Sequence, residues 1–188
     1  KTGTFGDIAA FSTMYRKNLA AGASSGLVYT TDKDLHYTAL SYADRGKPVR
    51  QSTEDLRNPG FAAFPALNWN TNELSCAIGL ANLRRLDDTN QRRLNFLKLL
   101  SPRLINETES CRPYNLHDGF SPFYYPIFVE TAKLACDKIS FAQALAAEGI
   151  GLGDHYGCLV STWEWAKPYM SDDFVTRNAI DTRDRCFH

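Results

Sequence analysis

The sequence lacks an excess of charge, a long apolar run and an apolar N-terminal signal segment. Its 188 residues include 21 Lys and Arg and 21 Asp and Glu, so the formal net charge is zero. Without a basic excess we expect no nucleic-acid partner. The apolar runs are far shorter than the roughly 20 residues needed to span a membrane, so we expect no membrane partner either.

Paired cysteines are also missing. Five cysteines lie far apart and none forms a C-x-x-C pair: Cys76, Cys111, Cys136, Cys158 and Cys186. We interpret them as reduced thiols, chiefly core filler, in a cytoplasmic protein. The histidines His36, His117 and His188 have no partners at ligand spacing, so the sequence predicts no metal site.

The composition that remains is that of a soluble globular domain, with 44% hydrophobic and 22% charged residues. The chain begins at Lys1 rather than Met and stops at His188 within a segment of structured appearance. We therefore expect it to be part of a longer protein.

The pattern of apolar residues predicts an α/β fold. Strands are expected at residues 7–12 and 26–31, and a helix capped by Asp32 is expected at 33–44. Two strands cannot make a stable sheet alone, so they need further strands from another segment or chain. Residues 47–70 carry three prolines and little periodicity, which indicates a long irregular connection.

Helical spacing resumes after Asn72, a predicted N-cap. It continues to Pro102, as one long helix or as two with a kink near Asp87 and Asp88. A strand is expected at 122–129, where Pro126 makes it an edge strand or interrupts it. A helix from Asp137 to Glu148 and a strand or turn at 150–156 follow. The WEWAKPYM stretch is expected to be a loop, and residues 172–186 a helix.

The stretch FSTMYRKNLAAGASSG, residues 11–26, places Lys17 between a strand and a loop of small residues. A lysine amine can attack an aldehyde, above all that of pyridoxal phosphate. The Ser12 hydroxyl and free backbone N–H groups can hold a phosphate. The spacing alone is a weak signal and favours a solvated turn between two strands over a cofactor site.

Three blocks extend this pattern. GTFGDIAAFS, four residues, KN and GLVYTTD form the first, NWNTNELSCAIGLANLRRLDD the second, and GIGLGDHY, more loosely, the third. In this order they resemble the DegT/DnrJ/EryC1/StrS family of pyridoxal-phosphate-dependent sugar aminotransferases. The resemblance covers nearly the whole chain.

The resemblance implies the fold of the PLP-dependent transferases of fold type I. Residues 1–100 would be the end of the large-domain sheet and the long connecting helix. Residues 101–188 would be a small C-terminal α/β domain, incomplete at its end. The function implied is transfer of an amino group from glutamate or glutamine to a keto sugar, expected to be nucleotide-linked.

The same resemblance implies roles for single residues. Lys17 would carry the cofactor, pyridoxal 5′-phosphate, and move a proton; Ser12 would bind its phosphate. Asn68 would reach the cofactor phosphate of another subunit, which implies a homodimer with a shared active site. His155 and Tyr156 would lie near the substrate, as part of its wall or in catalysis.

The chain departs from the family pattern in several places. Gly22-Ala23-Ser24-Ser25-Gly26 stands where the family has an acidic residue among glycines, and Asn70 stands where it has an arginine. The family's N-terminal half, with the aspartate that protonates the pyridine nitrogen, is not in this sequence, so we expect these 188 residues alone to be inactive. Two alternatives stay open: a non-catalytic binding or regulatory protein of this fold, and a sugar dehydratase, although dehydratases of the family replace the lysine with histidine.

Overall fold

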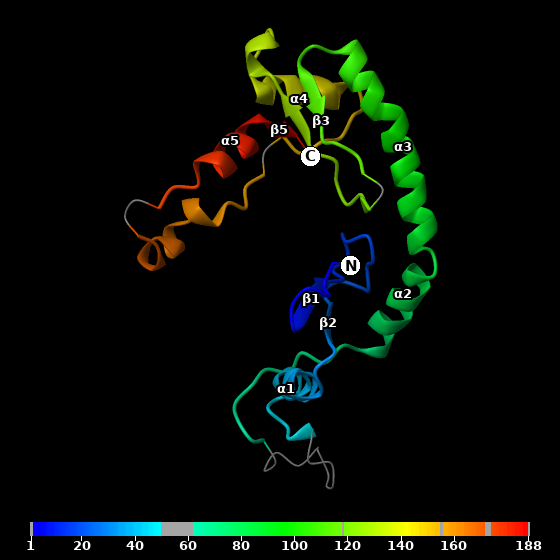
Figure 1. Cartoon of the computed structure of the whole chain (residues 1–188), viewed down its shortest axis with the longest axis vertical. Coiled ribbons are helices and arrows are strands. Elements are labelled where there is room, and N and C mark those ends of the chain that lie inside the picture. The colour runs from blue at the N-terminus through cyan, green and yellow to red at the C-terminus, as the bar shows by residue number, and fades with distance from the viewer. Residues whose placement is uncertain (1, 50–61, 118, 155, 172–173, 188) are drawn as a thin grey trace. The chain divides into compact units, whose positions relative to one another are not determined.

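The computed structural model describes residues 2–49, 62–117, 119–154, 156–171 and 174–187 (Figure 1). The chain divides into two compact units, Lys1–Thr89 and Asn90–His188. His155 and residues 50–61 of the predicted long connection lie outside the described residues. None of the described helices is long and apolar enough to cross a membrane.

The first unit contains an antiparallel pair of strands, β1 (Ile8–Ser12) and β2 (Gly26–Thr30). Their register runs from Ile8 opposite Thr30 to Ser12 opposite Gly26. Both predicted strands are confirmed. The pairing also brings the two ends of the Lys17 loop together, because Ser12 and Gly26 are its flanking residues.

Helix α1 (Lys33–Ala43) begins where the sequence predicts, because the Asp32 carboxylate accepts hydrogen bonds from the N–H groups of Asp34 and Leu35. The helix ends in a left-handed turn, with φ of 59° at Arg45 and 73° at Gly46. A Cβ on Gly46 would lie 1.8 Å from the carbonyl oxygen of Phe64, so only glycine lets the returning chain pass here.

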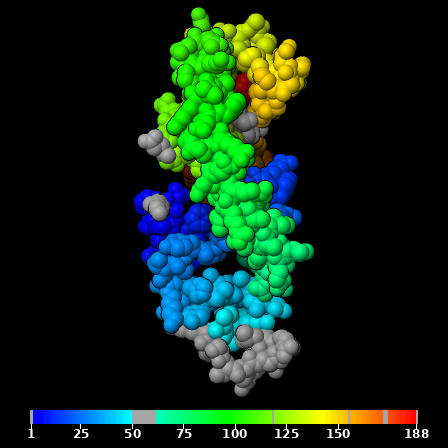
Figure 2. Space-filling model, turned by 90° about the vertical axis from the view of Figure 1, so that its right-hand side faces the viewer, coloured from blue at the N-terminus to red at the C-terminus, as the bar shows by residue number. Residues whose placement is uncertain are grey.

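Helices α2 (Glu73–Leu83) and α3 (Leu86–Glu107) follow the Asn72 cap, whose side chain accepts from the N–H of Ser75. The break falls at Arg84 and Arg85, a few residues before the predicted kink. The prediction that the helical run ends at Pro102 is wrong, because α3 continues through this proline to Glu107. Figure 2 shows α2 at the surface of the first unit.

The second unit is built on a three-stranded antiparallel sheet in the order β3 (Cys111–Pro113), β4 (Ile127–Val129) and β5 (Cys186–Phe187). Helices α4 (Lys138–Ala147) and α5 (Arg177–Arg185) belong to the same unit. Short 3-10 helices lie at η3 (Thr131–Lys133), η4 (Val160–Thr162) and η5 (Glu164–Tyr169). The core joins the sheet to α4 through Val129, Ala142 and Phe187.

Several predicted elements of this unit need correction. The strand expected at 122–129 begins only at Ile127, because Pro126 has no N–H for the ladder; its carbonyl instead accepts from the N–H of Tyr114. The WEWAKPYM loop contains η5, and the described residues of 150–156 form no strand. The helix expected at 172–186 is confirmed over Arg177–Arg185.

Candidate functional site

Lys17 lies on a compact turn that leaves the end of β1. Its backbone N–H donates to the carbonyl of Met14 at 2.9 Å, and the residue is partly buried. Ser12, the last residue of β1, is exposed, and its Oγ accepts from the N–H of Met14 at 3.4 Å. One turn therefore holds the amine and the hydroxyl that the sequence singles out.

Thr13, Ala21 and Ser25 lie where the two arms of the Lys17 loop meet, and we call this place the foot of the loop. A cluster of hydrogen bonds between these three residues closes it. Thr13 donates its N–H to the carbonyl of Ser25 at 2.9 Å and accepts at its own carbonyl from the N–H of Ala21 at 2.8 Å. The Ser25 hydroxyl lies 2.7 Å from the carbonyl of Ala21 and 2.8 Å from the Thr13 hydroxyl. Thr13 is 3% exposed, so this cluster is the buried base of the Lys17 loop.

Helix α2 supports the loop from its other side. The Asn82 amide donates to the carbonyl of Ala20 at 2.7 Å. Gly22, at a φ of 88°, and Gly79 mark close approaches, because an added Cβ would lie 2.8 Å from Ser75 Oγ in the first case and 2.9 Å from Ala21 Cβ in the second. The loop is thus held between β1, β2 and α2.

The residues present fit the amine and phosphate ends of pyridoxal phosphate. Lys17 offers a primary amine to an aldehyde, and the exposed Ser12 hydroxyl offers a donor to a phosphate oxygen. A Cβ added to Gly26, which lies opposite Ser12, would be 3.0 Å from the carbonyl oxygen of Phe11. Strand pairing therefore leaves little space for a side chain at position 26.

Asn68 lies in a separate hollow of about 580 Å³ in the first unit. The hollow is polar and is lined by Ser24, Ser25, Gly26, Val28, Ala43, Asn68, Trp69, Asn70, Thr71, Asn72 and Ser75. Lys17 and Ser12 are not among the described residues that line it. The structure therefore brings Asn68 to the Ser24–Gly26 side of the loop, and not to the turn that carries the amine.

The backbone around Asn68 is fixed against the end of α1. Asn68 forms an antiparallel bridge with Asp44, and Trp69 donates its N–H to the carbonyl of Ala43 at 2.8 Å. The Asp44 carboxylate holds Arg45 at 2.6 Å and Lys47 at 3.3 Å. Burial raises the pKa of Asp44, but the hydrogen bonds and charges of Arg45 and Lys47 outweigh it, so the pKa lies below its ordinary value.

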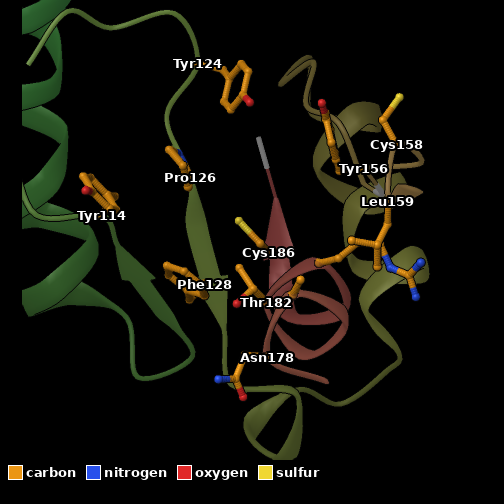
Figure 3. A pocket seen from close by; sticks show the side chains of 12 residues that line it. Tyr114, Tyr124, Pro126, Phe128, Tyr156, Cys158, Leu159, Asn178, Thr182 and Cys186 are labelled. Carbon is orange, nitrogen blue, oxygen red and sulfur yellow. The ribbon is translucent and has the colours of Figure 1, made fainter. Parts of the chain in front are cut away.

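Tyr156 lies in the second unit, at an apolar pocket of about 510 Å³. Figure 3 shows Tyr114 on one side, Tyr156 and Cys158 on the other, and Tyr124 and the Cys186 sulfur between them. Burial raises the pKa of the Cys186 thiol, although a hydrogen bond involving Ile127 and the charge of Lys138 act in the opposite direction.

Sequence reasoning missed the hydroxyl pair at the foot of the Lys17 loop and the tyrosines of the apolar pocket. The loop Gly22–Gly26 departs from the pattern of the resemblance, but Thr13, the partner of Ser25, stands twelve residues away in the sequence. Tyr124 belongs to the PFYYP stretch. The pocket that it lines forms only because α5 packs against the same sheet. Among the described residues no cluster of His, Cys, Asp or Glu could hold a metal ion.

Comparison with known proteins gives one family and one fold. A sequence profile of the DegT/DnrJ/EryC1/StrS aminotransferase family matches residues 1–187. GDP-perosamine synthase of Escherichia coli O157:H7 is 36% identical over 87 residues, which are 46% of this chain and 21% of that protein.

Solved structures agree with the fold over nearly all of the chain. The sugar aminotransferase CalS13 of Micromonospora echinospora matches with a TM-score of 0.75 at 21% identity, over 100% of this chain and 47% of its own. A DegT DnrJ EryC1 StrS aminotransferase of Brucella abortus matches with a TM-score of 0.80 at 20% identity, over 98% and 46%. GDP-4-keto-6-deoxy-D-mannose-3-dehydratase of E. coli, with bound hydrated PLP, matches with a TM-score of 0.82 at 18% identity, over 100% and 50%. The predicted fold class is confirmed, and the chain spans about half the length of these structures.

Proposed function

The chain belongs to the DegT/DnrJ/EryC1/StrS aminotransferase family, and from that premise we propose that it forms part of a pyridoxal-phosphate-dependent aminotransferase. The reaction proposed is transfer of an amino group from glutamate or glutamine to a keto sugar that is linked to a nucleotide. The observation that carries this proposal is Lys17 itself. It lies on a supported turn, five residues after an exposed serine, at the motif position of the cofactor lysine.

The proposed roles follow from the chemistry of each group. The bound cofactor supplies an electron sink for the bond-breaking step. Lys17 would hold the cofactor through its Nζ, and the same amine, when free, would take a proton from the donor Cα and give one during formation of the sugar amine. Ser12 holds the phosphate in place. The donor leaves as a 2-oxo acid, and the oxygen of the keto sugar leaves as water.

Asn68 supports a site shared between two subunits. It is exposed and lines a hollow that does not include Lys17. An asparagine so placed is available to another chain, as the family pattern implies. We therefore propose a homodimer in which Asn68 of each subunit contacts the cofactor phosphate held by the other.

The remaining assignments extend the same proposal. Residues 1–100 would complete a large cofactor domain, and residues 101–188 would form the small domain. Tyr156, at the rim of the apolar pocket, and His155 beside it would face the substrate. The five cysteines have no disulfide partner in the structure, which accords with a cytoplasmic location.

The test is a spectral titration of the protein as its gene encodes it. Pyridoxal phosphate is bound first, and glutamate or glutamine is then added in the absence of a sugar. We expect the absorbance of the cofactor to change to that of its amino form with stoichiometric release of 2-oxo acid. Lys17→Ala should slow this half-reaction by at least about a thousandfold, since both attachment and proton transfer are lost. Lys98→Ala, an exposed lysine on α3, is the matched control.

The same titration, followed by addition of the keto sugar, separates the alternatives. A non-catalytic protein would bind the cofactor without a donor-dependent change. A dehydratase would remove a hydroxyl of the sugar as water and release the nitrogen taken from the donor as ammonia, so isotopic nitrogen from the donor would not appear in the sugar product. The presence of Lys17 favours the aminotransferase.

A further inference from the structure

We propose that Ser25, with Thr13, is a positioning residue for Lys17. This inference rests on the proposed function, because it concerns the placement of the amine that would carry the cofactor. The pair lies at the foot of the loop and not at its tip, so it would act through the backbone of residues 13–25.

The geometry assigns a distinct task to each hydroxyl. Ser25 Oγ lies 2.7 Å from the carbonyl of Ala21 and 3.2 Å from that of Thr13. A serine hydroxyl has one proton, and the shorter distance favours donation to Ala21. Ser25 Oγ then accepts from Thr13 Oγ1 at 2.8 Å. Ser25 thereby joins both arms of the loop, and Thr13 fixes the orientation of Ser25.

This cluster extends the strand ladder by one step beyond Ser12 and Gly26. Thr13 donates its N–H to the carbonyl of Ser25 at 2.9 Å, so the two arms are held both by backbone and by side chains. Lys17 lies four residues beyond Thr13. Any widening of the foot would therefore displace the amine relative to Ser12.

The same observation gives a physical meaning to the altered loop. The family pattern has glycine and an acidic residue in this loop, whereas this chain has Ser24 and Ser25. Glycine can bend freely but cannot form side-chain hydrogen bonds. The Ser25 hydroxyl instead makes two hydrogen bonds, to the carbonyl of Ala21 and with the hydroxyl of Thr13, at a partly buried site.

The test compares four variants of the protein as its gene encodes it. Ser25→Ala removes both hydroxyl bonds, and Thr13→Val removes one while keeping the shape of the side chain. Ser25→Thr and Thr13→Ser keep the hydroxyl and serve as rescues. Thr38→Val is the matched control. The hydroxyl of Thr38 also donates to a backbone carbonyl, that of Asp34 at 2.8 Å, but Thr38 is an exposed residue of α1.

We expect kcat to fall about tenfold in Ser25→Ala and about threefold in Thr13→Val, with KM for the amino donor nearly unchanged. The rate at which pyridoxal phosphate becomes reducible onto Lys17 should fall in the same order. The hydroxyl-retaining variants should recover both rates to within about twofold. A purely structural role would lower the melting temperature while leaving kcat per folded molecule and the capture rate intact, and that result would overturn the inference.

The failure of the two proposals can be told apart. If borohydride fixes no cofactor on Lys17 of the unchanged protein, the proposed function fails and this inference with it. If the cofactor is fixed on Lys17 but Ser25→Ala and Thr13→Val behave as Thr38→Val does, only the positioning role is wrong.

Discussion

At the residue scale, polar contacts hold the candidate site together. Thr13 is buried at the foot of the Lys17 loop, whereas the larger apolar side chains of β1 and β2 that lie nearby are exposed, among them Ile8, Leu27 and Val28. Asp44 likewise makes polar contacts at the end of α1. Its carboxylate binds Arg45 and Lys47, and its backbone bridges to Asn68.

Asp44→Asn should destabilise the protein in a pH-dependent way. The folded state holds the pKa of Asp44 below its ordinary value, so this carboxylate adds stability that is fully present above about pH 4. That contribution is lost as the pH falls through the lower, folded pKa. We expect the variant to lose less than about 1 kcal/mol at pH 7, because the ion pairs are partly exposed, and to approach the parent protein as the pH falls below the folded-state pKa of Asp44.

Urea unfolding of both proteins across this pH range measures the difference. Asp7→Asn, a change at an exposed residue of the same unit, is the control. A loss of stability that is the same at pH 7 and pH 3 would show that the charge of Asp44 is not its source.

At the scale of elements, capping residues were predictable and short strands were not. Asp32, Asn72 and Asp137 each precede a helix, and each side chain accepts from the first turn, because a cap is a local interaction between neighbours. Strands β3 and β5 have three and two residues, too few for any periodicity to show. They form only because β4 lies between them, and the sequence does not display that pairing.

Proline effects were predictable only in part. Pro126 removes a ladder donor and delays β4, as its chemistry requires. Pro102 is accommodated inside α3, and the helix continues to Glu107. The Thr108 hydroxyl donates to the carbonyl of Leu104 at 2.7 Å and so satisfies one of the last carbonyls of that helix.

In the candidate site, too, local features could be predicted from the sequence and long-range contacts could not. The resemblance to the family, carried by sequence motifs, was enough to propose Lys17, Ser12 and Asn68. The closure of the loop by Thr13 and Ser25 depends on the register of β1 and β2, and its support by Asn82 depends on how α2 packs against Ala20, 62 residues away. Contacts over such separations leave no periodic trace in the sequence.

Lys138→Met should destabilise the second unit by about 2 kcal/mol. Lys138 is 8% exposed, and its ammonium donates to the carbonyls of Arg183 at 3.2 Å and Cys186 at 3.1 Å, at the end of α5. Methionine keeps the apolar stem but leaves both carbonyls without this donor. Denaturant unfolding measures the loss of stability, and Lys133→Met, at an exposed lysine of η3, is the control. A change in the free energy of unfolding below about 0.5 kcal/mol would mean that water replaces the ammonium at no cost.

At the scale of the whole molecule, the two units differ in how much they bury. The second unit has a core of its own, with Val129 fully buried and Phe187 2% exposed. Among the described residues of the first unit no apolar side chain is buried, and large ones such as Phe5, Trp69 and Leu74 are exposed, although the second unit also exposes Leu99, Trp165 and Tyr169. A second subunit, as proposed, would cover part of the apolar surface of the first unit.

Hydrogen exchange on the 188-residue chain should reveal this difference. We expect the amides of β4 to exchange at least about a hundredfold more slowly than those of β1 and β2, because a two-stranded sheet with exposed faces opens easily. The protein as its gene encodes it should protect β1 and β2 more strongly. Equal protection of both sheets in the short chain would contradict the view that the first unit depends on a covering partner.

The measurement that tests the central claim most directly is borohydride reduction of the protein with pyridoxal phosphate, followed by mapping of the modified peptide. The account predicts a single cofactor adduct on Lys17, within the peptide that follows Ser12, and its loss in Lys17→Ala. A stable adduct on another lysine, or none at all in the protein as its gene encodes it, would contradict the assignment of Lys17 as the cofactor lysine.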